Sequence, residues 1–266
     1  MSEDEKYILS YEGECERLEA QSLLFGHERA LAHIDPAPGT RLLDAGSGSG
    51  WLSRLVAERF PDCDVVGIDI NPDYVAYAQK RADQAGLSNL KYVTGSITDL
   101  PFEEATFDKV WSLMVLFFLP DKTAALSEFA RVTRPGGQVI ASQQCAPFRL
   151  LHPVDQEIEE GFGKIRDGAF PDWQPERLPA MMQAAGLGQI LVQMETDPLY
   201  TYIGAASAAQ LENDRNVISP AAERLSDAFG GKAKAREFVD RWVAYMADPD
   251  TYSFTSHWVV KGRKPI

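Results

Sequence analysis

The sequence predicts an α/β fold: a seven-stranded, mostly parallel sheet with helices on both faces and additional helical insertions that form a lid. Three observations support this prediction. Short apolar segments alternate with amphipathic segments between residues 41 and 144, a glycine-rich loop directly follows the first apolar segment, and the alternation stops after Ala146. Strand–helix alternation with short connections produces right-handed crossovers and a parallel sheet that is covered on both faces.

The composition is that of a globular protein. The chain has 266 residues, of which 45% are apolar and 24% are charged, so one sizeable core is expected. No stretch rich in Pro, Ser and Gly divides the chain, and we therefore expect a single domain over residues 1–266. The net charge of −13 disfavours a nucleic-acid partner and an anionic membrane surface, because both repel an acidic chain.

Cysteine usage and the N-terminus indicate a cytoplasmic location. The three cysteines lie far apart and show no spacing typical of a metal site, so reduced thiols and no metal are expected. The N-terminus MSEDEKYILS lacks the apolar core of a signal peptide. The longest apolar run, WSLMVLFFL, is shorter than the ~20 residues that a membrane helix needs. The oligomeric state, monomer or homodimer, stays open.

Residues 14–34 are expected to form one amphipathic helix. Leucines recur there among charged residues, Gly26 marks a bend, and the Pro- and Gly-containing segment 35–39 ends the helix. Residues typical of helix ends also occur later in the chain. Asn71 is suited to cap a helix with Pro72 at its first position, and Gly86 is suited to end it.

The period of the apolar residues and the length of each segment predict the remaining strands and helices. The predicted strands cover residues 41–46, 63–70, 90–96, 107–113, 138–144, 188–199 and 253–265. The predicted helices cover residues 51–60, 71–86, 121–133 and 175–187. Residues 147–174 and 205–248 interrupt this order with helical signals, and we expect both to be insertions that cap a substrate. In the second insertion an apolar stripe recurs at helical spacing, formed by Phe238, Val239, Trp242, Val243 and Met246.

The loop over residues 42–53, LLDAGSGSGWLS, predicts a ligand site at the carboxyl end of the first strand. A phosphate-binding loop of the type GxxxxGK[ST] needs a Lys, and none follows Gly50. A dinucleotide loop reads GxGxxG, and Trp51 stands where its third glycine would be, so that an indole would obstruct the packing of helix on strand. The loop therefore lacks the pattern of a pyrophosphate cradle.

Asp69, at the end of the second strand, indicates a nucleoside. A carboxylate at this point of an α/β sheet can accept hydrogen bonds from both hydroxyls of a ribose. The alternative role of Asp69 is to cap the helix over residues 71–86.

Five segments, in this order and spacing, resemble those of a class I S-adenosylmethionine-dependent methyltransferase: LLDAGSGSG, VVGIDINPDYV, TGSITDLPFEEATFDKVWS, MVLFFLPD and RVTRPGG. The pattern is most similar to the branch that includes ubiquinone and menaquinone C-methyltransferases and many methyltransferases of natural products. The resemblance covers roughly residues 40–145. It implies a Rossmann-like fold, S-adenosyl-L-methionine as cofactor, S-adenosyl-L-homocysteine as product, and an enzyme that methylates a small molecule.

The resemblance also implies which residues bind the cofactor. They are Tyr7, Gln21, Asp44, Gly46, Ser47, Gly48, Gly50, Asp69, Ile70, Ser96, Ile97 and Leu113. The backbone of the glycine loop would hold the methionine moiety, close to the helix N-terminus that starts after Gly50. Leu113 would offer its carbonyl to the methionine amino group. Asp44 has an alternative role, which is to brace the loop.

The other implied contacts concern the nucleoside and the lid. Asp69 would bind the ribose, Ile70 would pack on the adenine, and Ser96 and Ile97 would contact the adenine edge. The resemblance implies that the N-terminal region, residues 1–35, is a lid helix. Tyr7 and Gln21 would close over the methionine carboxylate; alternatively, Tyr7 only packs and Gln21 is only solvated.

Two positions depart from the family pattern. The family usually places an acidic residue where Ser96 stands, and Asp99 is the nearest carboxylate that could compensate. The family often has a His in the stretch that matches Phe117 and Phe118, so this chain lacks a base there and has an apolar wall instead.

Methyl transfer is a displacement for which the cofactor supplies the reactivity and the protein supplies alignment. A general base is needed only when the accepting atom carries a proton. His152 is the candidate base, with an ordinary loop histidine as the alternative. The first insertion and the segment that follows the sixth strand are aromatic, with Phe148, Phe162, Phe170, Trp173, Tyr200 and Tyr202. These rings favour an apolar or aromatic acceptor; alternatively, they form only the core of the lid.

Three hypotheses for function follow. The first is an S-adenosylmethionine-dependent methyltransferase that acts on a small molecule by direct displacement. The second is a non-methylating or regulatory relative that retains the cofactor, which the departures at Ser96 and at Phe117 and Phe118 keep open. The third is a NAD-dependent oxidoreductase, against which Gly50 and Trp51 argue.

Overall fold

The computed structural model describes residues 13–25, 27–170, 174–197 and 200–266. Its strands are β1 (Arg41–Ala45), β2 (Asp64–Asp69), β3 (Leu90–Thr94), β4 (Phe107–Leu113), β5 (Thr133–His152), β6 (Gly188–Thr196), β7 (Tyr202–Ile203) and β8 (Tyr252–Arg263). Its α-helices are α1 (Glu14–Phe25), α2 (Ala30–Ile34), α3 (Trp51–Arg59), α4 (Pro72–Gln84), α5 (Lys122–Val132), α6 (Gln156–Ala169), α7 (Leu178–Ala184), α8 (Ala208–Arg224), α9 (Ser226–Phe229) and α10 (Lys232–Ala247). Short 3₁₀ turns cover His27–Arg29, Leu116–Phe118 and Pro175–Arg177.

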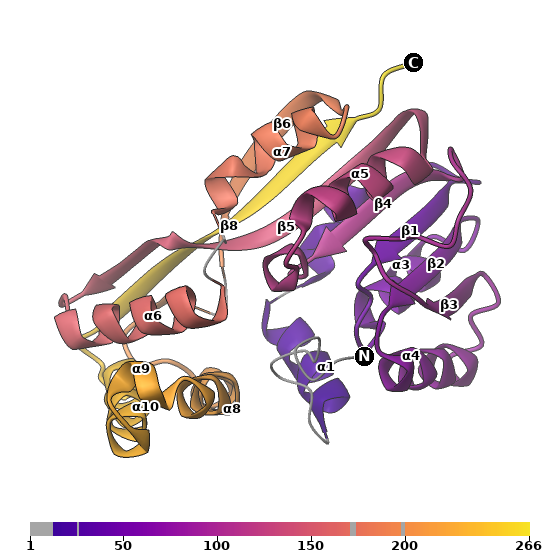
Figure 1. The fold of residues 1–266 in the computed structure, drawn as a ribbon. Coiled ribbons are helices and arrows are strands. Elements are labelled where there is room, and N and C mark those ends of the chain that lie inside the picture. Colours follow the sequence, from indigo (N-terminus) through magenta and orange to yellow (C-terminus); the bar gives the residue numbers. More distant parts are fainter. Residues whose placement is uncertain (1–12, 26, 171–173, 198–199) are drawn as a thin grey trace. The chain divides into compact units, whose positions relative to one another are not determined.

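The chain divides into two compact units (Figure 1). The first, here called the helical unit, comprises Met1–Arg17, Cys145–Trp173 and Thr196–Ser256. The second, here called the sheet unit, comprises Leu18–Gln144, Gln174–Glu195 and His257–Ile266. Most of the helical unit consists of the predicted insertions 147–174 and 205–248. Their role as a substrate cap stays a prediction, as does the single-domain organisation.

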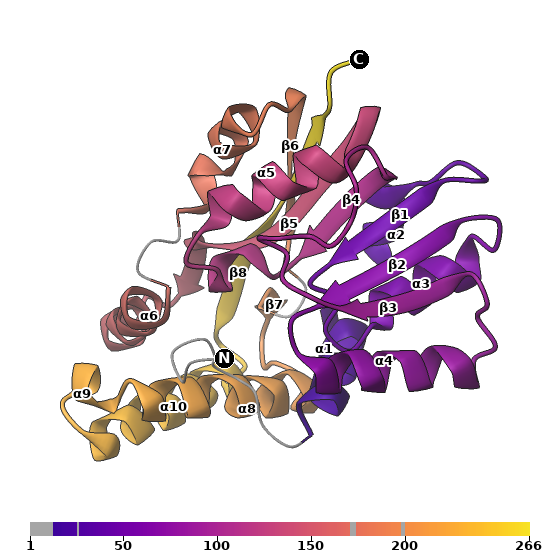
Figure 2. The ribbon, with the colours of Figure 1, turned by 45° about the vertical axis from the view of Figure 1, so that its right-hand side comes forward.

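The sheet confirms the predicted α/β class. Its strand order is β3-β2-β1-β4-β5-β8-β6, and the pairs β1–β2, β1–β4, β2–β3 and β4–β5 are parallel. Figure 2 shows α5 in front of β4 and β5, and α4 beside β3. The order reverses between β1 and β4, so their carboxyl ends form the switch point at which such sheets bind ligands.

Two strands differ from the prediction. The strand expected over residues 138–144 extends over Thr133–His152, and the described part of the chain contains an eighth strand, β7, that was not predicted. The prolines near residue 150 suggested an irregular insertion, yet side chains alternate there: Leu151 is buried, whereas Leu150 and His152 are exposed. This alternation is one of burial and not of residue type, because the exposed Leu150 is as apolar as the buried Leu151, so the sequence carries no strand period here. β7 has only two residues, too few for a pattern.

Most other boundaries lie within a few residues of those predicted. Asn71 caps α4 by accepting a hydrogen bond from the Asp73 N–H at 2.9 Å, and Gly86 adopts the left-handed conformation after the helix, with φ of 69°. The predicted first helix is divided into α1, a 3₁₀ turn and α2. Gly26, the predicted bend, lies outside the described residues.

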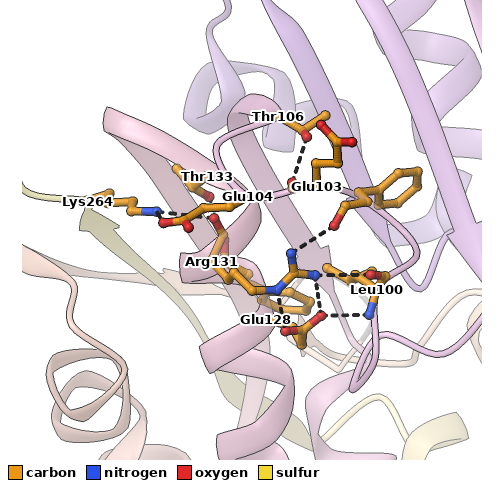
Figure 3. A network of polar contacts seen from close by, with 10 residues as sticks. Leu100, Glu103, Glu104, Thr106, Glu128, Arg131, Thr133 and Lys264 are labelled. Atoms are coloured by element: carbon orange, nitrogen blue, oxygen red, sulfur yellow. Dashed lines mark hydrogen bonds and ion pairs between the residues drawn. The ribbon is translucent and has the colours of Figure 1, made fainter.

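A polar network fixes the loop that follows β3 (Figure 3). The Arg131 guanidinium, from α5, donates to the carbonyls of Phe102 at 2.8 Å and of Leu100 at 3.0 Å. The same guanidinium donates to both carboxylate oxygens of Glu128 at 2.7 Å, and Glu128 accepts from the Leu100 N–H at 2.7 Å. Lys264 donates to the Arg131 carbonyl at 3.1 Å. One arginine thus joins the loop, the helix and the C-terminal strand region.

We predict that Arg131→Met lowers the free energy of unfolding by about 2–3 kcal/mol, because two loop carbonyls and Glu128 lose a charged donor. Arg134→Met is the matched control. It removes an exposed ion pair with Asp108 at 2.9 Å and should cost less than about 1 kcal/mol. Urea unfolding of both variants measures the difference, and equal losses would contradict a special role for Arg131.

Candidate cofactor site

The glycine loop lies at the switch point of the sheet unit. The N–H groups of Gly46 and Ser47 both donate to the carbonyl of Ile68, at 2.8 and 2.9 Å. The Gly48 N–H donates to Oδ2 of Asp69 at 2.9 Å. The loop is therefore fastened to the end of β2, beside the point where β1 ends.

Glycines are required in this loop for two physical reasons. Gly46, Gly48 and Gly50 have φ values of 86°, 53° and 75°, a region that other residues rarely adopt. A Cβ on Gly46 would lie 2.5 Å from the side chain of Val115, which follows β4. A Cβ on Gly50 would lie 2.4 Å from the Tyr92 hydroxyl. The side chain of Val115, after β4, thus lies directly against the backbone of Gly46, after β1.

Asp44 is fastened to α3; its predicted contact with the cofactor and the alternative role, a brace for the loop, both stay predictions. The carboxylate is 3% exposed and accepts a hydrogen bond from the Ser53 hydroxyl of α3 at 2.5 Å. Burial raises the pKa of Asp44 to about 7; the charge of Asp69 raises it further, and the Ser53 hydrogen bond opposes the shift. The side chain therefore holds the N-terminal turn of α3 against β1.

Asp69 ends β2 and accepts two backbone hydrogen bonds. Besides the bond from Gly48, its Oδ1 accepts from the Asn71 N–H at 2.9 Å. Asn71, and not Asp69, caps α4. Burial raises the pKa of Asp69, and the bonds from the Asn71 and Gly48 N–H groups lower it. Each carboxylate oxygen can accept more than one hydrogen bond, so the group can still bind hydroxyls.

The residues predicted to contact adenine come from β2 and from the loop after β3. Ile70 directly follows Asp69 and is 52% exposed, which leaves an apolar side chain available for a ring. The Ile97 side chain is buried. The Ser96 hydroxyl pairs with that of Thr98 at 2.8 Å, and Asp99 is exposed.

The chain turns sharply where β4 ends. Leu113 is followed by Met114, a non-glycine residue with φ of 57° whose N–H donates to the Ser142 carbonyl at 2.8 Å. Ser142 lies opposite Leu113 in β5, and its hydroxyl lies 2.6 Å from Nε2 of His257 in β8. His257 is buried in β8, and its pair with Ser142 was not predicted, because nothing in the sequence gives the register of β5 and β8.

The part of α1 that belongs to the sheet unit lies beside the loop. The Leu18 side chain is 3.5 Å from where a Cβ on Gly48 would be, and Glu19 forms an ion pair with Arg54 of α3. Gln21 is half-buried on the same helix. Tyr7 lies outside the described residues, so its predicted contact stays a prediction.

His152, the candidate base, belongs to the helical unit. It is the last residue of β5, is exposed, and stacks on Tyr252 with ring centroids 5.0 Å apart and an angle of 17°. Tyr200 and Tyr202 are buried in the same unit. Trp173 lies outside the described residues, and the Phe148 side chain is not described.

The described part of the chain offers neither a metal cluster nor a membrane span. Across those residues, His, Cys, Asp and Glu do not gather in any group that could hold a metal ion. No described helix has the length and apolar character needed to cross a bilayer.

The fold and this loop define a nucleoside-binding α/β protein, and comparisons give its family. Residues 43–141 match a family model described as a methyltransferase domain. A malonyl-[acyl-carrier protein] O-methyltransferase of Erwinia pyrifoliae is 38% identical over 159 residues, which are 60% of this chain and 55% of that protein. A demethylmenaquinone methyltransferase of Thermus thermophilus is 31% identical over 169 residues, which are 58% of this chain and 76% of that protein. The chain thus spans about half of the first relative and three quarters of the second.

A solved structure shows the same fold. The [4+2]-cyclase SpnF is 21% identical, with a TM-score of 0.60 over 92% of this chain and 83% of that one. The chain belongs to the class I S-adenosylmethionine-dependent methyltransferases, as the sequence motifs indicated. S-adenosylmethionine is the cofactor of this family.

We predict that Gly46→Ala destabilises the protein by about 2–5 kcal/mol, since the left-handed backbone and the contact with Val115 both oppose a Cβ. Gly39→Ala is the control, because Gly39 has a φ of 77° but a Cβ added there would meet no atom within 4 Å. The double variant Gly46→Ala/Val115→Ala should recover part of the loss. Urea unfolding separates these contributions, and equal effects at both glycines would contradict the close approach.

We predict that Asp44 makes stability fall as the pH rises. Its pKa is about 7 in the folded chain and 3.8 for an unperturbed aspartate, so folding favours the protonated form, and this contribution is lost between about pH 4 and pH 7. The shift corresponds to roughly 4 kcal/mol as an upper limit. The difference in unfolding free energy between Asp44→Asn and the natural chain should therefore shift in favour of the variant when the pH is raised from 5 to 8. Thermal unfolding at both pH values measures this, and exposed Asp62→Asn should show no such trend.

Proposed function

We propose that this protein transfers the methyl group of S-adenosylmethionine to a small, apolar or aromatic molecule by direct displacement. The observation that carries the proposal is the loop at the switch point, where glycine backbone and the Asp69 carboxylate meet at the end of β2. A bound cofactor would supply an activated methyl group on a sulfonium. The chain would bind and orient it.

The donors and acceptors at the switch point fit this cofactor. Asp69 accepts two hydrogen bonds and keeps acceptor capacity for ribose hydroxyls, and the exposed Ile70 next to it offers an apolar surface to adenine. Backbone from Asp44 to Gly50 would surround the methionine moiety, and Leu113 would receive its amino group. Ser96, Ile97, Gln21 and Tyr7 would complete the site, and α1 beside Gly48 supports a lid there.

The acceptor decides whether a base takes part. A carbon or nitrogen nucleophile without an acidic proton needs only alignment, whereas a phenol or alcohol needs its proton removed. His152 is the base we propose for that case, because its imidazole is exposed and histidine is suited to exchange protons near neutral pH. The two relatives named above act on demethylmenaquinone and on a malonyl group of acyl-carrier protein, so similarity does not select one acceptor.

The alternative proposal is a protein that binds the cofactor without methylating. The fold is shared with a protein named as a cyclase, and a fold alone does not fix a reaction. Ser96 and the Phe117–Phe118 pair, with ring centroids 4.1 Å apart, replace polar residues of the family pattern. A NAD-dependent oxidoreductase is disfavoured because Trp51 starts α3 where a dinucleotide loop has glycine.

We further infer a cytoplasmic protein that works as a monomer or homodimer. The acidic composition and the small number of widely spaced cysteines support this proposal. Size-exclusion chromatography with light scattering distinguishes the two oligomeric states.

Calorimetric titration with S-adenosylhomocysteine, with NAD as comparison, tests the proposed function. We expect micromolar binding of the first and none of the second, followed by transfer of labelled methyl to an acceptor in a screen of phenols, quinols and carboxylic acids. Binding without transfer to any acceptor would favour the non-methylating alternative. Binding of NAD alone would overturn the proposal.

We predict that Asp69→Asn weakens S-adenosylhomocysteine binding by about 1.5–3 kcal/mol, because the ribose hydroxyls lose charged acceptors. Asparagine keeps one acceptor oxygen for the loop, so the fold should persist. Asn71→Ala is the control, since it removes the helix cap and keeps the carboxylate. Equal affinities of Asp69→Asn and the natural chain would remove the ribose role.

A further inference from the structure

The helical unit, which contains no described residue assigned to the cofactor, holds several buried polar atoms that have no hydrogen-bond partner among the described residues. They come from six side chains on β5, β7, β8 and α8: Arg149, Tyr202, Asn213, Asp214, Ser253 and Thr255. Such atoms normally have a partner, because burying one without a partner costs about 1–3 kcal/mol. Several in one small unit therefore call for an explanation.

Arg149 contributes two of these atoms. Its Nε and Nη1 atoms are buried and have no hydrogen-bond partner among the described residues, although the side chain as a whole is only half-buried. The guanidinium carbon lies 3.9 Å from the ring centroid of Phe162, and 5.4 and 5.6 Å from those of Tyr200 and Trp242. Aromatic rings thus cover the flat guanidinium, and its N–H edges remain for another partner.

The neighbouring carboxylate does not pair with this arginine. Asp214 is fully buried; its Oδ2 accepts from the Trp242 indole N–H at 2.7 Å, and its Oδ1 has no partner among the described residues. Burial raises the pKa of Asp214 to about 7, so much of it is protonated at neutral pH. Burial also lowers the pKa of Arg149, opposed by the charges of Tyr200, Asp214, Asp197 and Tyr202.

The sheet register places three further hydroxyls on one face. Tyr202 lies opposite Ser253 in the antiparallel pair β7–β8, and Thr255 is two residues further along β8. All three are buried, the Ser253 and Thr255 hydroxyls have no hydrogen-bond partner among the described residues, and the charge of Arg149 acts on Tyr202. The opposite face carries exposed side chains, among them Phe254 and Ile203. The Arg149 guanidinium and the three hydroxyls of this group can all donate hydrogen bonds.

We propose that the helical unit binds the carboxylate of an apolar molecule, with the Nε–H and Nη1–H of Arg149 as donors and the Tyr202, Ser253 and Thr255 hydroxyls around it. A carboxylate presents only acceptors, which matches these donors, and it neutralises a buried guanidinium. The aromatic rings of Phe162, Tyr200 and Trp242 and the apolar core around them fit an apolar body. All residues of this site belong to the helical unit, and the site goes beyond the proposed methyl transfer.

The test compares matched acids, methyl esters and alcohols on the full-length protein. The panel contains octanoate, decanoate, 3-phenylpropanoate and 4-phenylbutanoate with their esters and alcohols, titrated by calorimetry. We expect at least one acid to bind saturably and at least tenfold more tightly than its ester and its alcohol. Preference for an ester or alcohol, or no saturable binding of any acid, would overturn the proposal.

Variants locate the site. Arg149→Met should abolish the preference for acids while the melting temperature stays or rises, because an apolar side chain can replace a buried charge. Arg149→Lys keeps the charge and should retain part of the preference for acids. This variant tests the assignment if Arg149→Met fails to fold. Exposed Arg166→Met is the matched control and should bind acids as the natural chain does. An unchanged preference in Arg149→Met would contradict the assignment.

S-adenosylhomocysteine binding, measured on the same samples, separates the two proposals. Its affinity should be unchanged in Arg149→Met, since the described cofactor residues belong to the sheet unit. Acid binding without S-adenosylhomocysteine binding would leave this inference standing and defeat the proposed function. The reverse result would defeat this inference alone.

Discussion

The close approach of backbone and side chains around the glycine loop is the constraint on which the sheet unit depends. The Tyr92 ring lies against Gly67, where a Cβ would be 2.4 Å away, and its hydroxyl donates to the Gly50 carbonyl at 2.9 Å. Burial raises the pKa of Tyr92, so the hydroxyl keeps its proton and remains a donor. One tyrosine on β3 therefore requires glycine both in β2 and at the start of α3, and it sets the distance between strand and helix.

This packing explains how a short loop can be a binding site. Three loop N–H groups are already engaged by Ile68 and Asp69, so the loop is held in place before any ligand arrives. Asp44 and Ser53 fix the helix behind it. A site that is preorganised in this way loses little conformational entropy when a ligand binds. This favours the binding of a large, flexible cofactor, because the cofactor itself loses conformational entropy on binding.

The sequence predicted the sheet unit well because its signals are local. Asn71, Pro72 and Gly86 act on their own helix, and Asp69 is recognised from its place after an apolar strand. The helical unit was harder to predict, since β5 continues through Pro147 and β7 has two residues. The pair of Ser142 and His257 and the group around Arg149 depend on register between distant strands, which no local pattern contains.

The two buried carboxylates of the cofactor site and the buried guanidinium of Arg149 differ in their hydrogen bonding. In the sheet unit, Asp44 and Asp69 both have hydrogen-bond partners within the chain. In the helical unit, Arg149 is surrounded by aromatic rings while two of its nitrogens lack such partners among the described residues. If stability alone mattered, an apolar side chain would serve better there. The proposed carboxylate ligand gives this arginine a role, because it would pair with the guanidinium charge.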